Sequence, residues 1–182
     1  RLKAGAMGGA ETAFKFTFLA GRWMLMMSGD DDSDMRTVAM ALRRCFAEHV
    51  QSGQRIDETN AGSLISEALR RWKHDQCDQI VASDWGLTYD AFRKSGRDSI
   101  PSDLYALTMR HISDVSPRVA FIVSGFAGVS EPFPYLFHYD GRDGRVKVRD
   151  EFALVGCGEH LAQAVLLKHE HMETRRLNRT LW

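Results

Sequence analysis

Hydrophobic and polar residues alternate near the start of the chain, and the pattern predicts a β-hairpin. In residues 14–18, phenylalanine alternates with lysine and threonine, which is the period of a half-buried strand. Residues 20–22 (Ala-Gly-Arg) supply the turn, and the apolar run 23–27 is typical of a strand covered on both faces. Ser28 and Gly29 then end the second strand.

Two amphipathic helices are predicted next. Ser33 or Asp34 can cap the first helix, because a short side-chain oxygen accepts from the free amides of the first turn. One face of this helix carries Met35, Val38, Leu42, Cys45, Phe46 and His49 at helical spacing. A second helix is predicted over residues 60–76, and its buried stripe is Leu64, Ile65, Ala68, Leu69 and Trp72. Two such helices after a hairpin predict a helical layer lying on a sheet.

Residues 80–116 are predicted to form a mostly helical insertion. Residues 83–86 have the composition of a turn, residues 89–94 predict a helical turn, and residues 100–103 predict the start of another helix. The apolar residues expected to face inward from this last helix are Leu104, Leu107, Met109 and Ile112.

Strands dominate from residue 118 onward. The predicted strands are 119–126, 134–139, 146–148 and 152–155, with a strong turn signal at 140–144. A final helix follows, with Leu161, Ala164 and Val165 inward. Because the helices and strands are segregated along the chain, the predicted class is α+β with layered helices and antiparallel sheets.

Composition narrows the function classes. The 182 residues suffice for one domain, and 24 Lys and Arg balance 24 Asp and Glu, so no global field attracts nucleic acid or an anionic membrane. No apolar run is long enough to span a bilayer. The three cysteines form no CxxC pair, which argues against a structural zinc site or a disulfide framework and predicts a reducing, cytoplasmic location.

Two groups in the hairpin are candidates for chemistry, and each has a simpler interpretation. Lys15 lies among aromatic residues expected to be buried, yet a strand lysine is usually exposed. Gly29 has a backbone amide that no side chain shields, which could donate a hydrogen bond. In the simpler interpretation, this glycine only ends the strand. Outside the hairpin, Cys157 is a third candidate. A cysteine in such a position is more often a small buried hydrophobic residue than a nucleophile.

Neither candidate metal cluster has the spacing of a metal site. The acidic residues 30–34 lack the glutamate spacing of a calcium loop, and a solvated helix start explains them better. His169 and His171 are two residues apart on a predicted helix, so they do not share a face. No metal or cofactor is therefore expected.

The chain resembles the proteasome β-subunit family of N-terminal-nucleophile hydrolases, including the bacterial proteasome-like peptidases. The spacing from Lys15 to Gly29 matches this family without a gap, and Arg1 precedes Lys15 by the spacing of the family's second-strand arginine. Residues 121–126 resemble the family's central strand. Residues 134–158, a strand, a turn, then Gly-Cys-Gly before a helix, are similar to the family's signature, and the resemblance covers nearly all of the chain except 80–116.

The resemblance implies a mechanism. In this family an N-terminal threonine hydroxyl attacks the peptide carbonyl while its α-amine takes the proton. By position, Lys15 would stabilise the hydroxyl anion and the Gly29 amide would donate to the oxyanion. Cys157 would stand where the family usually has a serine near the α-amine, with weaker hydrogen bonding. Thr12 and Thr17 are not expected to be the nucleophile, which the resemblance puts upstream of Arg1.

The resemblance also implies the architecture and partners. We expect one proteasome-like domain over 1–182, a four-layer αββα sandwich that lacks the first hairpin and the last part of the fold. The expected function is a threonine-type endopeptidase subunit that degrades unfolded polypeptides inside stacked rings of its own copies, with an ATP-dependent unfoldase left open as a partner. A catalytically silent structural ring subunit, and an amidohydrolase of the same superfamily with a Ser or Cys nucleophile, are the alternatives.

Overall fold

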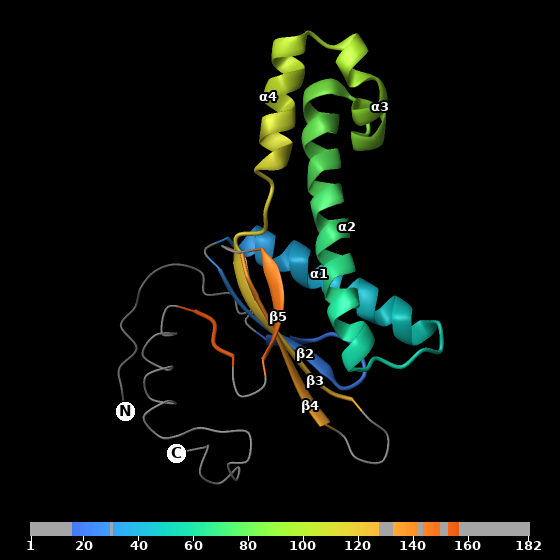
Figure 1. The fold of residues 1–182 in the computed structure, drawn as a ribbon, viewed down its shortest axis with the longest axis vertical. Helices are drawn as coiled ribbons and strands as arrows, with labels where there is room; N and C mark the ends of the chain where they lie inside the picture. Colours follow the sequence, from blue (N-terminus) through green and yellow to red (C-terminus); the bar gives the residue numbers. More distant parts are fainter. Residues whose placement is uncertain (1–15, 30, 128–132, 142–143, 150–152, 157–182) are drawn as a thin grey trace.

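An antiparallel sheet of five strands in the order β1-β2-β3-β4-β5 forms the base of the molecule (Figure 1). The computed structural model describes residues 16–29, 31–127, 133–141, 144–149 and 153–156. The strands are β1 (Phe16–Phe18), β2 (Trp23–Gly29), β3 (Val119–Ala127), β4 (Phe133–Asp140) and β5 (Arg145–Arg149). The helices are α1 (Asp32–Gln51), α2 (Glu58–Trp85), α3 (Tyr89–Ser99) and α4 (Ser102–Ser113). The predicted α+β class with an antiparallel sheet is confirmed.

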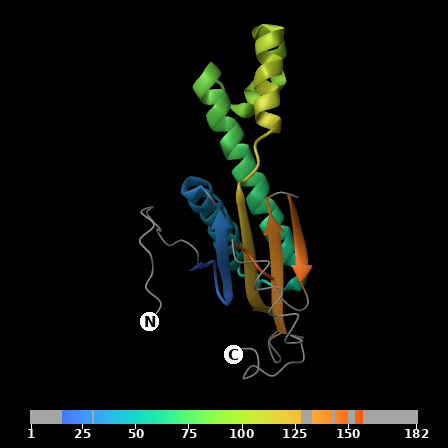
Figure 2. The ribbon, with the colours of Figure 1, turned by 90° about the vertical axis from the view of Figure 1, so that its left-hand side faces the viewer.

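The helices α1 and α2 cover one face of the sheet (Figure 2). On β2, Trp23, Leu25 and Met27 are buried beneath them, whereas Met24 and Met26 point to the opposite face and Met26 is 43% exposed. The prediction that β2 is covered on both faces was therefore wrong. The described residues contain one sheet with helices on one side, so the four-layer sandwich stays a prediction.

The aromatic residues of β1 also differ from the prediction. Phe16 and Phe18 lie opposite Met26 and Met24, and Phe18 is 66% exposed. Directly opposed residues share a face, so both rings lie on the side of the sheet away from α1 and α2. The predicted setting of Lys15 among buried aromatics was wrong for these two neighbours.

Trp23 is packed flat against the backbone of the central strand. A Cβ on its cross-strand partner Gly125 would come within 2.2 Å of the indole, so only glycine leaves room for the ring. The indole also contacts the rings of Phe46 and Phe137, each with its centroid 6.0 Å away. Gly125 thus allows α1, β2 and β4 to meet around one aromatic side chain.

Both sheet-covering helices begin two or three residues earlier than predicted. Asp31, not Ser33 or Asp34, caps α1 by accepting from the amides of Ser33 and Asp34. Asp57 caps α2 in a capping box with Asn60. The second helix extends to Trp85 rather than residue 76, and it ends at Gly86, whose φ of 65° fits a left-handed cap.

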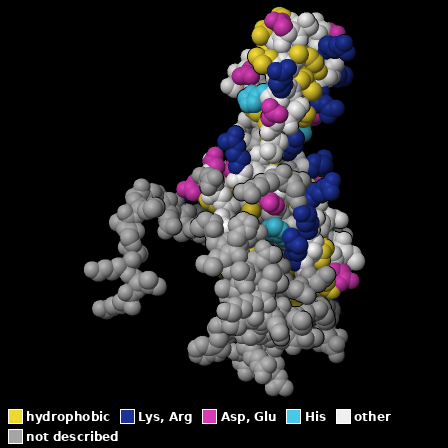
Figure 3. Space-filling view, turned by 60° about the vertical axis from the view of Figure 1, so that its left-hand side comes forward, with side chains coloured by type: hydrophobic (Ala, Val, Ile, Leu, Met, Phe, Trp, Pro, Cys, Tyr) yellow, Lys and Arg dark blue, Asp and Glu magenta, His cyan; other side chains and the backbone are white. Residues whose placement is uncertain are grey.

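The C-terminal half of α2, together with α3 and α4, projects beyond the sheet as a helical extension, residues 73–113 (Figures 1 and 2). This helical extension has a core of its own, formed by Cys77, Val81, Phe92, Ile100 and Ile112. On the face shown in Figure 3, hydrophobic side chains gather near its tip among Lys and Arg side chains.

The inward face of α4 was only partly predicted. Ile112 is buried as expected, but Leu107 is 61% exposed and Leu104 is also exposed. Thr108 is buried instead, because its hydroxyl accepts a hydrogen bond from the indole of Trp85, 3.1 Å away. No helix in the described ranges has both the length and the apolar character needed to cross a membrane.

The end of the chain is described only in part. Residues 153–156 have no strand structure, so the strand predicted over 152–155 is wrong for them. The predicted final helix, with Leu161, Ala164 and Val165, lies outside the described residues, as do His169 and His171.

Candidate functional site

The region predicted to carry the chemistry lies at the end of β2, at Gly29. Gly29 is paired with Val119 at the start of β3. A Cβ on Gly29 would lie 2.9 Å from the carbonyl oxygen of Arg118 and 3.2 Å from a methyl of Val119. Close backbone approach is therefore a structural reason for glycine here, independent of any role for its amide.

The first turn of α1 holds this region together. The Asp31 carboxylate accepts from the Ser33 and Asp34 amides at 2.7 and 3.3 Å. The Asp34 carboxylate accepts from the amide of Arg118 at 3.0 Å, which ties the start of α1 to the start of β3. Asp31 and Asp34 thus stabilise the start of α1, in agreement with the interpretation of the acidic run as a helix start.

A second predicted segment meets the end of β2. Gly156, with φ of 109°, lies so that a Cβ would be 3.4 Å from the hydroxyl of Ser28. Ser28 belongs to the β2 face opposite to Trp23, Leu25 and Met27, so Gly156 lies on the side of the sheet away from α1 and α2. The residue before Cys157 and the residue before Gly29, which are 128 positions apart, are neighbours.

Lys15 and Cys157 themselves lie outside the described residues, as do Arg1 and Thr12. Their roles stay predictions.

The two described free cysteines lack the exposed, electropositive setting of a reactive thiol. Cys45 and Cys77 are buried, and desolvation raises the pKa of both thiols. Each belongs to a hydrophobic core rather than to a cleft. Among the described residues, no group of three or more His, Cys, Asp or Glu side chains is placed to hold a metal ion.

Two features were missed by reasoning from the sequence. The Tyr135 hydroxyl on β4 donates a hydrogen bond to Glu58 in the first turn of α2, and this bond raises the pKa of Tyr135. A hollow also opens at the Trp23 end of β2, far from Gly29. Both features join segments distant in sequence, so no local motif signals them.

Comparison with models of protein families and with curated proteins finds no match to this sequence. The family therefore stays a prediction from the residues that carry the resemblance.

Proposed function

We propose that this chain is a subunit of a ring-forming peptidase of the proteasome β type. One observation carries the proposal: Ser28-Gly29 and Gly156 are neighbours, as the resemblance requires of its oxyanion glycine and its Gly-Cys-Gly segment. The order of elements supports it as well, because a hairpin, two covering helices and three further antiparallel strands follow one another, with β3 at the centre of the sheet.

The proposed chemistry needs groups from several parts of the chain. The resemblance implies a threonine nucleophile whose own α-amine acts as the base. The Gly29 amide donates to the oxyanion, Lys15 lowers the pKa of the attacking hydroxyl, and Cys157 lies near the α-amine. Substrates are unfolded polypeptides, because a ring of identical subunits excludes folded proteins sterically, and an ATP-dependent unfoldase would deliver them.

A catalytically silent structural subunit is the second candidate, and one observation favours it. Gly29 is required by the packing of β2 against β3, so its presence is not specific to an oxyanion site. A silent subunit would keep the fold and the ring contacts without turnover.

The test uses the full-length protein. N-terminal sequencing and intact mass are expected to show a mature terminal threonine, and mass photometry is expected to show a ring. Lys15→Ala should reduce hydrolysis of a fluorogenic peptide by about 100-fold or more. Lys73→Ala, at an exposed lysine on α2, is the matched control and should leave turnover unchanged.

The outcomes separate the candidates. Equal turnover in both variants overturns the assignment of Lys15. A ring without a terminal threonine and without turnover supports the structural subunit instead. A monomer without turnover overturns both candidates.

A further inference from the structure

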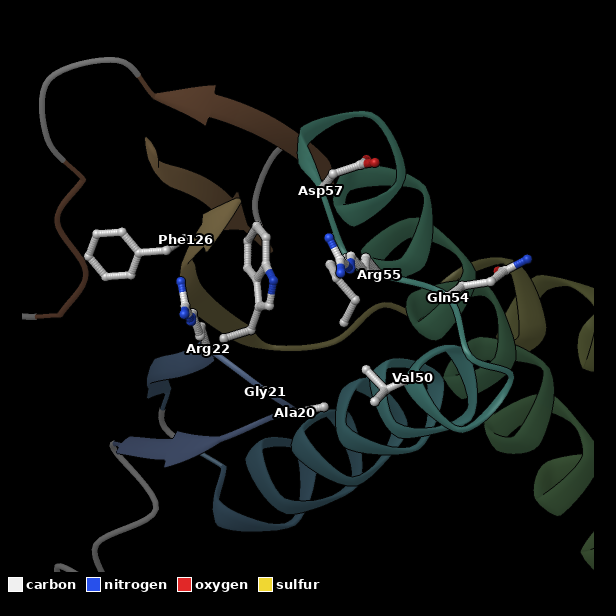
Figure 4. Close-up of a pocket in the computed structure, with 10 residues that line it drawn as sticks. Ala20, Gly21, Arg22, Val50, Gln54, Arg55, Asp57 and Phe126 are labelled. Carbon is white, nitrogen blue, oxygen red and sulfur yellow. The ribbon is translucent and has the colours of Figure 1, made fainter. Parts of the chain in front are cut away.

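A hollow of about 520 Å³ lies at the Trp23 end of the sheet (Figure 4). Three segments line it: the β1–β2 turn, the loop between α1 and α2, and the end of β3. Its volume is in the range of small-molecule sites. Gly29 is at the other end of β2, six residues from Trp23, so about 20 Å separates the hollow from the region of the proposed peptidase chemistry.

The walls of the hollow are largely apolar. Trp23 and Ile56 contribute the inner surface, and Val50 and Phe126 are exposed at its rim. Phe126 is 48% exposed. An exposed aromatic ring beside a hollow provides a stacking surface for a flat apolar ligand.

Two arginines supply positive charge from different segments. Figure 4 shows Arg22, which belongs to the hairpin turn, beside Phe126. Arg55, which belongs to the loop between α1 and α2, lies on the other side of the hollow. Within the described part of the chain, neither guanidinium has a hydrogen-bond or ion-pair partner. Guanidinium groups bind carboxylates and phosphates through paired hydrogen bonds. Two guanidinium groups that line one hollow could therefore bind an anionic group there.

The acidic residue in the lining does not neutralise these arginines. Asp57 caps α2, and its carboxylate accepts from the Thr59 hydroxyl, the Thr59 amide and the Asn60 amide. These bonds, the Thr59 hydroxyl first, lower the pKa of Asp57 and keep it ionised against the helix N-terminus. His49 nearby contacts the carbonyl of Arg55 and the amide of Asn60 rather than the hollow.

We propose that this hollow binds a small organic anion with a flat apolar body, an aromatic carboxylate or an aromatic phosphate. Arg22 and Arg55 hold the acid group, and Phe126 with Ile56 contacts the ring. The inference does not depend on peptidase activity, because every residue that it uses is described and none belongs to the end of β2 near Gly29.

Isothermal titration calorimetry of the full chain tests the proposal with three probes: phenylacetate, phenyl phosphate and uncharged phenylacetamide. At least one of the two anions should bind, and phenylacetamide should bind at least about tenfold more weakly, because it lacks the charge. The anion that binds more tightly identifies the acid group. Absence of binding by both anions overturns the proposal.

Variants test the assigned residues. Arg22→Gln and Arg55→Gln should each weaken the bound anion about tenfold. Phe126→Ala should weaken all ring-containing probes. Arg43→Gln, an exposed arginine on α1 outside the hollow, removes the same charge and should leave affinity unchanged. Equal weakening by Arg43→Gln and the two hollow variants would mean non-specific attraction and would overturn the site, and thermal unfolding of each variant checks that the fold is intact.

Discussion

The two hydrophobic cores of this chain are built in different ways. The main core joins residues far apart in sequence, such as Leu25, Phe46 and Phe121, and draws on α1, α2 and the sheet. The extension core, by contrast, contains only residues from 77 to 112. The main core therefore requires the whole fold, whereas the extension core requires only a local helix arrangement. We expect the extension to open at a lower free energy than the sheet.

Polar contacts compensate for the small size of the extension core. The Asp78 carboxylate accepts from the Tyr89 amide at 2.7 Å, which fixes the turn between α2 and α3. The Trp85 indole donates to Thr108, which joins α2 to α4. The two cores are connected by α2, which contributes to both, and by Val115, which packs against both.

The largest expected effect is in the main core. Phe46 is fully buried against Trp23, so Phe46→Ala should lower the free energy of unfolding by about 4 kcal/mol. Urea denaturation measures this loss. Met40→Ala, at an exposed residue of the same helix, should change stability by less than about 0.5 kcal/mol. A loss below about 1 kcal/mol for Phe46→Ala would contradict the assignment of this core.

The second prediction concerns the extension. Phe92 is fully buried and stacked on Tyr105, with ring centroids 4.9 Å apart. Phe92→Ala should cost about 3 kcal/mol, confined to the extension. Hydrogen exchange should then show lost protection in α3 and α4 with β2 and β3 unchanged. An equal loss of protection in the sheet would mean that the two cores unfold as one unit.

A smaller effect is expected at the start of α2, where the helix belongs to the main core. Asp57→Ala removes the capping box and should cost about 1 kcal/mol. Asp57→Asn keeps a capping oxygen and is the matched control. A similar loss in both variants would assign the effect to charge rather than to capping.

The same residue makes this contribution depend on pH. Because the folded-state pKa of Asp57 lies below its ordinary value of 3.8, the stabilisation by its ionised form is present above pH 3.8 and is lost as the pH falls through the folded-state pKa. The stability difference between the native chain and Asp57→Ala should therefore shrink below pH 3.8. A difference that stays constant down to pH 2 would contradict this prediction.

The smallest effect is expected where α2 touches the sheet. A Cβ on Gly62 would lie 3.3 Å from the ring of Phe137, slightly closer than an ordinary contact. Gly62→Ala gains about 1 kcal/mol of helix propensity, and displacement of the ring offsets most of it, so the net change should be within about 0.5 kcal/mol. Thermal unfolding measures it, and a loss above about 1 kcal/mol would mean that Phe137 cannot move.

The main core was largely predictable from the sequence because one period dominates each of its elements. The segments that form β3 and β4 are rich in β-branched and aromatic residues. The prediction of the inward face of α1 was correct for Met35, Val38 and Leu42. The extension was less predictable because its packing does not follow apolarity. Thr108 is buried on α4 while Leu107 is exposed, since the Trp85 indole supplies the hydroxyl with a partner.

The candidate sites could be predicted from the sequence only where all of their residues belong to one continuous segment. Gly29 and the Gly-Cys-Gly segment could be found as local motifs, but their approach through Ser28 and Gly156 depends on the fold. The hollow between Arg22, Arg55 and Phe126 could not be predicted, because its residues come from three segments without a shared pattern. The exposure of Phe16 and Phe18 was missed for a related reason: alternation defines two faces of a strand and does not say which one is covered.

The fluorescence of Trp85 can report on the contact between α2 and α4, because its indole donates a hydrogen bond to Thr108. Trp23 and Trp72 are buried in the main core, and the Trp72 indole donates to Thr37, whereas Trp85 belongs to the extension. A variant in which Trp85 is the sole tryptophan would shift its emission to longer wavelength as α4 separates from α2. Opening of the extension could then be followed in real time while the sheet remains intact.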